Sequence, residues 1–345
     1  MILPQMDNSR RALVTGGLGF VGSHVAAELL KRDYDITILD DGSNANPDAV
    51  AEYNNHPRVR IVNGSTLDID ALAGAARGCG QIYHLAAIVG VRRVAGNPRG
   101  VLDAHVESAH NVVHICKERR LPLLYVSSSE VYGSAESRGS NSARAFHESD
   151  APGFDRTRIA TDGRAAYAYS KWLGEQAVAQ LAEAGIPAVV VRPFNMIGAG
   201  QSFESGSLVP SLILQALTTF EMRLESDGGA TRAWLPVRDA ARAFVELMHC
   251  GSAQGRIINV GGTRVLSILQ IAELLKEILG FEASIHLHQK TTPAGMVTIR
   301  DRRPDLARFY ECLGWRPESP VSGALEEAVQ FARRSSIICA GAAAI

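Results

Sequence analysis

One feature of the sequence limits the possible folds more than any other: a glycine-rich turn in LVTGGLGFVGSHVAAELL, residues 13–30. The preceding RALVT is typical of a buried strand, and the following SHVAAELLKR has the spacing of an amphipathic helix. Glycines at intervals of three let the chain turn tightly, let a phosphate approach the backbone and let the helix pack close to the sheet. The helix N-terminus adds free N–H groups and partial positive charge. The turn therefore predicts a site for the pyrophosphate of a dinucleotide, formed by Gly16, Gly19, Phe20, Val21 and Gly22.

A second strand-like segment, YDITILDD (residues 34–41), ends in two aspartates, Asp40 and Asp41. Asp40 lies 21 residues after Gly19, where an acidic side chain accepts hydrogen bonds from both ribose hydroxyls and repels a 2′-phosphate. The two segments together predict NAD rather than NADP as the cofactor. The simpler alternative is a turn with two solvated aspartates.

The alternation of strands and helices continues along the chain. Strand-like RVRIVNG, QIYHLAA, LPLLYVSS and IPAVVVRPFN alternate with helix-like segments at residues 69–77, 98–119 and 165–184. Strands separated by helices of this length predict an α/β fold with a Rossmann-type, doubly wound parallel sheet. Such sheets bind ligands beyond the carboxyl ends of their strands. We therefore expect Leu85, Ala86 and Ala87 of HLAA, and the serines of SSSEVYG, to lie at the cofactor.

Composition and charge exclude several other classes of protein. Of the 345 residues, 46% are hydrophobic and 21% are charged, and the formal net charge is -1, which gives no bulk attraction to nucleic acid or to an anionic membrane. No apolar run approaches the ~20 residues of a membrane helix, and the start MILPQMDNSRR lacks an apolar signal core. The five cysteines are scattered without metal-ligand spacing. We therefore expect a cytoplasmic protein without a metal site and without a nucleic-acid or membrane partner.

The segment YAYSK places Tyr167 and Lys171 four residues apart on a predicted helix, hence on one face. A tyrosine normally titrates near ~10, too high for a base at neutral pH, and a neighbouring ammonium group lowers that pKa by stabilising the phenolate. Ser128, at the end of a predicted strand, can bridge a substrate hydroxyl to the phenol. With the glycine turn, these residues predict an enzyme in which Ser128, Tyr167 and Lys171 are catalytic and the last two also contact the cofactor.

These motifs, in this order, resemble the extended short-chain dehydrogenase/reductase family of nucleotide-sugar epimerases, dehydratases and decarboxylases. The resemblance extends from about residue 11 to residue 333 and rests on TGGLGFVGSH, HLAA, SSSEVYG, YAYSK, RPFNMIGAGQ, TRAWLPVRD and NVGG. It implies a smaller C-terminal domain that binds a nucleotide-sugar substrate. Asn195 and Arg232 would hold the nucleotide diphosphate, because guanidinium groups suit phosphate geometry. A second phosphate contact would come from Arg302 or Arg303, and Val209 would also contact the substrate.

Three positions depart from the family pattern. Where the family often has an aspartate that contacts adenine, this chain has Ser65, with Asp68 three residues later, so that Ser65 and Thr66 are the expected contacts. His105 replaces the usual asparagine in the helix before the serine strand, and we interpret it as structural. The familiar YGP after the arginine–asparagine motif is IGA, which would reshape the sugar pocket.

The resemblance implies that catalysis begins with oxidation at C4 of the sugar, and that the 4-keto intermediate then has three possible outcomes. A 4,6-dehydratase needs an acid where this chain has Ser129, which is a poor one. Decarboxylases resemble the triplet Ser128-Ser129-Glu130, in which Glu130 would handle a proton at C5, although it could instead be bonded to backbone amides. The segments HLAAIVGVRRV and GRAAYAYSKWLGEQ are more similar to the broad epimerase group.

We therefore predict a UDP-hexose or UDP-hexuronate 4-epimerase first and a UDP-glucuronate decarboxylase second. A third class, the NAD-sensing or RNA-associated regulators of the superfamily, usually lacks the tyrosine or the lysine, and this chain has both. Nor does it have a basic stretch with interleaved aromatics.

The same reasoning divides the chain into an NAD-binding domain (residues 1–191), a nucleotide-sugar-binding domain (residues 192–334) and a tail (residues 335–345). Residues 232–262 are expected to pack back against the sheet. Polar segments at residues 133–150 and 154–164 are long enough to form a mobile flap. The helices at residues 98–119 and 165–184 resemble the pair that forms a four-helix interface in dimeric relatives, so a homodimer is expected.

Overall fold

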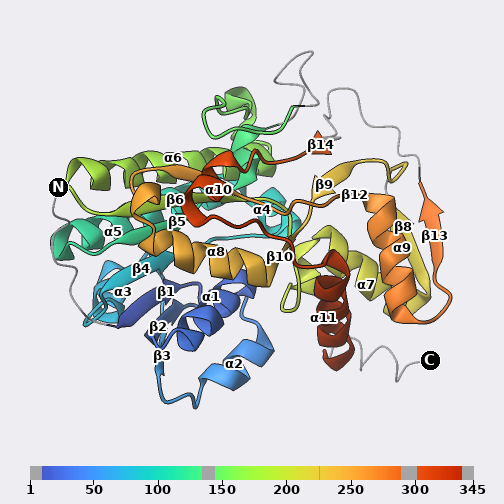
Figure 1. Cartoon of the computed structure of the whole chain (residues 1–345), viewed down its shortest axis with the longest axis horizontal. Helices are drawn as coiled ribbons and strands as arrows, with labels where there is room; N and C mark the ends of the chain where they lie inside the picture. Colours follow the sequence, from blue (N-terminus) through green and yellow to red (C-terminus); the bar gives the residue numbers. More distant parts are fainter. Residues whose placement is uncertain (1–9, 134–143, 225, 289–300, 336–345) are drawn as a thin grey trace.

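The computed structural model describes residues 10–133, 144–224, 226–288 and 301–335. Within these ranges, seven parallel strands form a central sheet in the order β11-β6-β5-β4-β1-β2-β3 (Figure 1). From β1 the chain builds outward to β3, then returns to the other side of β1 and builds outward again. This reversal is the topology of a doubly wound Rossmann sheet. The strands are β1 (Arg11–Thr15), β2 (Asp35–Asp40), β3 (Val59–Asn63), β4 (Gln81–His84), β5 (Leu123–Val126), β6 (Ala188–Pro193) and β11 (Ile257–Val260).

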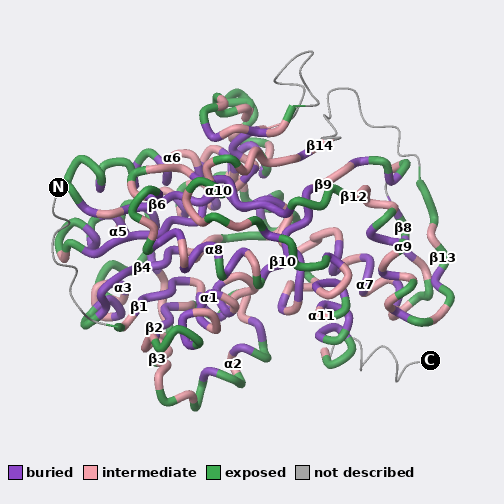
Figure 2. The backbone as a smooth tube through the Cα atoms, viewed as in Figure 1, coloured by how far each residue is buried: buried purple, intermediate pink, exposed green. Residues whose placement is uncertain are grey.

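Helices cover both faces of the sheet because successive strand residues point to opposite sides. Ala12 and Val14 of β1 belong to the core on one face, and Leu13 belongs to the core on the other. Buried residues accordingly follow the strands and the inner sides of the helices (Figure 2). The first face is covered by α1 (Phe20–Lys31), α2 (Pro47–Tyr53) and α8 (Val237–His249), and the second by α3 (Ile69–Ala75), α5 (Pro98–Arg119) and α6 (Gly163–Glu183).

Capping explains where the helices begin. Asn97 caps α5 and Pro98 follows it at the first helical position, so this helix has the bounds that the sequence predicts. Helix α1 begins at Phe20, three residues earlier than SHVAAELLKR suggests, because Gly19 is already in an extended conformation at the N-cap. Helix α6 begins at Gly163 because the Asp162 side chain accepts bonds from the next two free amides.

A second group of elements lies at one end of the molecule around its own hydrophobic core (Figure 1). Helix α7 (Leu208–Thr219), helix α9 (Ile268–Leu279) and helix α11 (Val321–Arg334) pack around it with the strand pair β8 (Glu221–Leu224) and β13 (Ser284–Leu287). A small three-stranded sheet consists of β12 (Val265–Ser267), β9 (Thr231–Ala233) and β14 (Asp301–Arg302). The remaining short elements are the strands β7 (Met196–Ile197) and β10 (Leu235–Pro236), the helices α4 (Val91–Gly96) and α10 (Ala307–Leu313), and the 3-10 helices η1 (Ser129–Tyr132), η3 (Arg156–Arg158), η4 (Phe203–Ser205) and η5 (Gly251–Ala253).

The chain crosses between the two groups more than once. Helix α8 and strand β11 come after residue 191, yet α8 packs on α1 and β11 pairs with β6 in the parallel sheet. In the first expected flap segment, residues 133–150, the part from 134 to 143 lies outside the described ranges. Later in the same segment, Phe146 forms a β-bridge with Pro304. The expected tail also lies outside the described ranges, apart from Ser335. None of the described helices combines the length and apolar character needed to cross a bilayer.

Candidate active site

A cavity of about 480 Å³ opens beyond the carboxyl ends of the parallel strands. Its walls come from the turn after β1, the ends of β2, β4, β5 and β6, and the first turns of α6. All of the residues that the sequence assigns to the cofactor lie on these walls: Gly16, Gly19, Phe20, Val21, Gly22, Asp40, Asp41, Ser65, Thr66, Leu85, Ala86, Ala87, Tyr167 and Lys171. So do Ser128, Ser129 and Glu130, together with Asn195 and Arg302 from the expected substrate set.

Two glycines of the turn, Gly16 and Gly22, have no space for a side chain. Gly16 has φ +68°, and a Cβ there would lie 2.8 Å from the backbone of Ala86. A Cβ on Gly22 would lie 2.0 Å from the carbonyl oxygen of Gly16. The backbone therefore stays open to a ligand at the start of α1, as a pyrophosphate at a helix N-terminus requires.

Asp40 joins the end of β2 to this turn. Its Oδ2 accepts from the Leu18 N–H and its Oδ1 from the Gly42 N–H, both at 2.9 Å. Burial raises the pKa of the Asp40 carboxyl. Each carboxylate oxygen has a second lone pair, so the group can still accept from ribose hydroxyls while it holds the turn in place.

The adenine end differs from the family pattern. Ser65 Oγ accepts from the Leu67 N–H at 3.2 Å, and the Thr66 hydroxyl is bonded to that of Ser108 at 2.6 Å. Asp68 caps α3 by accepting from two backbone amides, and it is not among the residues that line the cavity. Its side chain therefore serves the helix, leaving Ser65 and Thr66 at the cavity wall.

Helix α6 and the end of β5 bring three candidate catalytic side chains together. Ser128 lies close to the Tyr167 side chain and lowers its pKa, and Ser128 Oγ accepts from the Glu130 N–H at 3.1 Å. Lys171 Nζ lies 5.9 Å from the centre of the Tyr167 ring and donates to the carbonyl of Val126 at 3.0 Å. The hydroxyl, the phenol and the ammonium group therefore face the same part of the cleft.

The pKa of Tyr167 does not follow the sequence-based expectation of a lowered value. Burial and the neighbouring Glu130 charge raise it to about 12, against a smaller lowering by the Ser128 hydrogen bond. Burial also lowers the pKa of Lys171 to about 8, although the charge of Glu175 opposes this shift. In the protein alone, Tyr167 is therefore a neutral phenol at pH 7, and any activation must come with the bound ligands.

Glu130 is fixed between two arginines. Its carboxylate accepts from Arg302 Nη1 at 2.5 Å and from Arg164 Nε at 2.6 Å. Burial alone would raise the pKa of Glu130, but the two guanidinium groups hold it well below its usual range. The sequence left open that Glu130 is bonded to backbone amides, but its carboxylate is bonded to arginine side chains instead. Arg164 is not identified as a site residue from the sequence alone. The one pattern that points to it is its position three residues before Tyr167, on the same side of the helix.

Further polar groups gather at the substrate end of the cleft. In the small sheet, Arg232 pairs directly with Arg302, and burial, followed by the charges of Arg302 and Arg164, lowers the pKa of Arg232 to about 10. Nine buried side-chain atoms of the described residues have no hydrogen-bond partner, and three of them are Asn195 Nδ2, Gln201 Oε1 and Arg302 Nε. Because Asn195, Gln201 and Arg302 all line the cavity, a polar ligand could satisfy them.

Two of the expected substrate residues lie elsewhere, and Arg232 does not line the cavity directly. Val209 is buried in the hydrophobic core around α7, so its side chain does not reach the cleft. Arg303 is likewise absent from the cavity wall, and its carbonyl accepts from the Phe146 N–H at 2.7 Å. Of the adjacent arginine pair, Arg302 is the one that reaches the site.

His105 on α5 lies next to Tyr167 and is bonded through both of its ring nitrogens. Its Nε2 accepts from the Ile88 N–H at 2.8 Å, its Nδ1 is bonded to the Ser170 hydroxyl at 2.8 Å, and its ring meets the Tyr167 ring edge-on at 5.6 Å. Burial first, and then the Lys171 charge, lower the pKa of His105 to about 3. A neutral imidazole with both nitrogens bonded suits a positioning role next to Tyr167.

A Rossmann sheet with a glycine turn, an acidic end of β2 and a Tyr-x-x-x-Lys pair at the cleft defines an enzyme of the short-chain dehydrogenase/reductase type. The sequence model of the NAD dependent epimerase/dehydratase family matches residues 12–261. The protein therefore belongs to this family, and its cofactor is NAD. The predicted family, fold class and cofactor are confirmed.

Known relatives carry out different reactions. The chain is 29% identical over 328 residues to a UDP-N-acetyl-alpha-D-glucosaminuronate decarboxylase of Bacillus cytotoxicus, covering 94% of this chain and 98% of the relative. It is 30% identical over 334 residues to a dTDP-4-dehydro-6-deoxy-D-allose reductase of a Streptomyces species, covering 94% and 96%. A solved UDP-glucuronic acid 4-epimerase of Bacillus cereus superposes with a TM-score of 0.80 at 25% identity, covering 94% and 99%. Identity alone thus does not select the reaction.

Proposed function

We propose that this protein oxidises a UDP-hexuronate at C4 of the sugar and decarboxylates the 4-keto intermediate. The observation that carries the proposal is the position of Glu130 between Arg302 and Arg164, beside Tyr167 and close to Arg232. Three guanidinium groups lie in this cluster, those of Arg164, Arg232 and Arg302. They outnumber its two carboxylates, Glu130 itself and Asp301, which Thr231 contacts. A diphosphate alone is anionic, but a cationic cluster this close to the catalytic phenol also favours a carboxylate on the sugar. This reverses the order in which sequence alone ranked the epimerase and the decarboxylase.

The same geometry disfavours a 4,6-dehydratase. Such an enzyme needs a proton donor for the departing C6 hydroxyl. Ser129 is buried and has no acidic group, and the arginines keep Glu130 in its carboxylate form at neutral pH because they lower its pKa. Neither residue supplies an acid.

Each candidate residue has a role in the oxidation. Gly16, Gly22 and Asp40 would hold NAD, which supplies the hydride acceptor and later the hydride donor. Once the ligands are bound, the Tyr167 phenol loses its proton to solvent and the phenolate takes the proton of the C4 hydroxyl, which Ser128 orients beside it. The ammonium group of Lys171 stabilises the phenolate that forms on Tyr167.

The loss of carbon dioxide follows from the chemistry of a β-keto acid. The C5–C6 bond breaks, carbon dioxide leaves, and the electron pair forms an enolate across C4 and C5. A proton from water then adds to C5, and return of hydride to C4 with a proton from Tyr167 restores the alcohol. The cations around Glu130 stabilise the negative charge of the enolate, and the Tyr167–Ser128 pair serves both oxidation and reduction.

A 4-epimerase acting on the same substrate is the second candidate, and the UDP-glucuronic acid 4-epimerase of similar fold and 25% identity favours it. Epimerisation removes and returns hydride at C4 and leaves C5 untouched. The two reactions therefore differ at C5 and in product mass.

The deciding experiment uses purified protein with NAD in deuterated water. UDP-glucuronate and UDP-N-acetylglucosaminuronate are the test substrates, and UDP-glucose, which lacks the carboxylate, is the matched control. We expect release of carbon dioxide and one deuterium at C5 of the product. A product of unchanged mass with inverted C4 and no deuterium would replace the decarboxylase with the epimerase. Turnover of UDP-glucose alone would contradict an acidic substrate.

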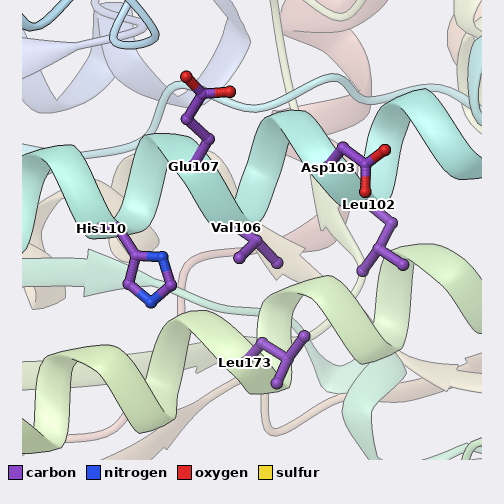
Figure 3. A pocket seen from close by; sticks show the side chains of 6 residues that line it. All are labelled: Leu102, Asp103, Val106, Glu107, His110 and Leu173. Carbon is purple, nitrogen blue, oxygen red and sulfur yellow. The ribbon is translucent and has the colours of Figure 1, made fainter.

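We also propose that the protein is a homodimer joined through α5 and α6. Helices α5 and α6 form a shallow hollow in which apolar side chains lie between the two helices (Figure 3), and these half-buried apolar side chains beside charged ones suit a protein partner. The hollow is lined by Leu102, Asp103, Val106, Glu107, His110 and Leu173. Light scattering should give twice the chain mass for the wild type and for Lys31→Glu on α1, and one chain mass for Val106→Glu/Leu173→Glu. A monomeric wild type would contradict the proposal.

A further inference from the structure

A buried carboxylate lies behind the Tyr167–Lys171 pair and has no part in the chemistry described above. Glu175 follows Lys171 by four residues and Tyr167 by eight on α6, so all three side chains leave the same side of the helix. The Glu175 side chain is only 1% exposed. A carboxylate buried to this extent is costly unless charges and hydrogen bonds compensate it.

Two strands of the sheet supply those partners. Arg192 on β6 donates from Nε to Oε1 of Glu175 at 2.8 Å and from Nη2 to Oε2 at 2.6 Å. The Ser127 hydroxyl donates to Oε1 at 2.5 Å, and the Ser127 N–H donates to the carbonyl of Val191 at 2.8 Å. Ser127 immediately precedes Ser128, so the bonds to Glu175 fix the strand end that carries the catalytic hydroxyl.

Lys171 lies between this carboxylate and the cleft. Its Nζ donates to the carbonyl of Val126, the residue before Ser127. Burial lowers the pKa of Lys171 to about 8, and the charge of Glu175 opposes that shift. Without the carboxylate, an ammonium group in this position would have no anion to offset its burial among the described residues.

Neighbouring elements add no compensating charge. Four titratable side chains face Lys171 from the elements around it: His84 on β4, His105 on α5, Tyr125 on β5 and Tyr167 on α6. Burial is the first cause that lowers the pKa of both histidines to about 3 and raises the pKa of both tyrosines. All four are therefore neutral at pH 7, and the Arg192 guanidinium is paired with Glu175.

We propose that Glu175 is a positioning residue of the active site, which holds the Ser127–Ser128 strand end in place and keeps Lys171 in its ammonium form. The proposal rests on the role proposed above for Lys171, but not on the choice of sugar. The alternative is a purely structural ion pair, in which Glu175 only neutralises Arg192 in the core. The two differ in what happens to Lys171 when the charge of Glu175 is removed.

A titration of Lys171 by NMR tests the proposal without turnover. The sequence has five lysines, so carbon-13 labelling at lysine Cε gives few signals, and Lys171→Arg assigns the one of interest. In the wild type we expect Lys171 to titrate near its pKa of about 8. In Glu175→Gln the Lys171 midpoint should fall. The alkaline limb of kcat should move with it, costing about tenfold in kcat above the midpoint for each pH unit of the fall.

Two further variants keep the test decisive. Glu175→Gln leaves Arg192 without its counter-charge, which destabilises the core, so Glu175→Gln/Arg192→Gln, with both charges removed, is used if the single variant does not fold. Glu183→Gln, exposed on the same helix, should leave the Lys171 midpoint unchanged.

An unchanged Lys171 midpoint in the Glu175 variants, with only a lower unfolding temperature, would overturn the proposal in favour of a structural ion pair. A lower midpoint with an unchanged pH profile of kcat would contradict the proposed role of Lys171, and with it the place of Glu175 in the active site. Neither result depends on which sugar is turned over.

Discussion

Among single residues, the cleft separates groups that change protonation from groups that stay charged. Tyr167 and Lys171 have pKa values of about 12 and about 8, both moved by burial toward the neutral forms. Glu130 is moved the other way by Arg302 and Arg164. The phenol is therefore the group suited to proton transfer, Lys171 supplies an ammonium charge beside it, and Glu130 with its two arginines is suited to binding charge.

Tyr167→Phe tests the phenol. Loss of the hydroxyl removes the group that takes the C4 proton, so we expect turnover to fall by at least ~10²-fold, the lower range for acid–base catalysis. Folding and NAD binding should persist because the ring still packs against His105. Steady-state kinetics and an NAD titration are the measurements. Turnover within a few fold of the wild type would remove Tyr167 from the mechanism.

Asp40→Ala tests the choice between NAD and NADP. The carboxylate accepts from ribose hydroxyls and repels a 2′-phosphate, so its removal should weaken NAD binding and narrow the preference for NAD over NADP. Calorimetric titration of both cofactors measures the two affinities. Asp70→Ala is the matched control, since Asp70 is exposed on α3 and is not among the residues that line the cavity. Equal affinity of the wild type for both cofactors would sink the assignment.

Among the secondary-structure elements, the turn between β1 and α1 is tightly constrained by close backbone contacts. The N-cap is Gly19 and has no side chain to supply a capping bond, so the free amides at the start of α1 are available to a ligand. The end of β2 closes over the same turn through Asp40. The element boundary is thus part of the binding site.

Gly22→Ala should damage both NAD binding and folding. The new Cβ would lie 2.0 Å from the carbonyl oxygen of Gly16, a contact that only a backbone shift can relieve. The control is Gly74→Ala in α3, where a Cβ meets nothing within 4 Å and helix propensity favours alanine by about 0.5–1 kcal/mol. Thermal unfolding and NAD titration should show a loss for the first variant and a small gain in stability for the second. Normal NAD affinity in Gly22→Ala would contradict the assigned turn.

On the scale of the whole molecule, Glu130 links the sheet to the C-terminal elements. It follows β5, and its partners are Arg164 on α6 and Arg302 on β14. Helix α8 and strand β11, which come late in the sequence, also pack on the early elements, α8 on α1 and β11 beside β6. The cleft is therefore enclosed by segments far apart in the sequence.

Glu130→Gln should destabilise the protein in a pH-dependent way. Removing one partner of a buried pair costs about 3 kcal/mol, because Arg302 is 3% exposed. The folded pKa of Glu130 is lowered, so the stability that its carboxylate contributes is present above its unfolded pKa of ~4.3 and declines as the pH falls below that value. Chemical unfolding at pH 7 and pH 3.5 should show a larger wild-type advantage at pH 7. A difference independent of pH would mean that the carboxylate charge is not involved.

The sequence by itself determined the parts of the protein that depend on local periodicity and spacing. The strands β1 to β6, the bounds of α5, the glycine turn, Asp40 and the Tyr167–Lys171 pair all follow from patterns within one strand–helix unit, because side-chain direction repeats every two or 3.6 residues. The rule that ligands bind at the carboxyl ends of parallel strands then places Ser128 beside Tyr167. Short-range order was sufficient for all of these.

Only the tertiary structure decided the contacts between segments distant in the chain. Arg302 meets Glu130 across 172 residues, Val209 turns into the core of α7 rather than toward the cleft, and Glu175 meets Arg192 and Ser127 beneath Lys171. The pKa values of Tyr167 and Lys171 depend on burial and on these same neighbours. Spacing along the chain says nothing of such partners, because burial and charge contacts arise only when separate elements pack together.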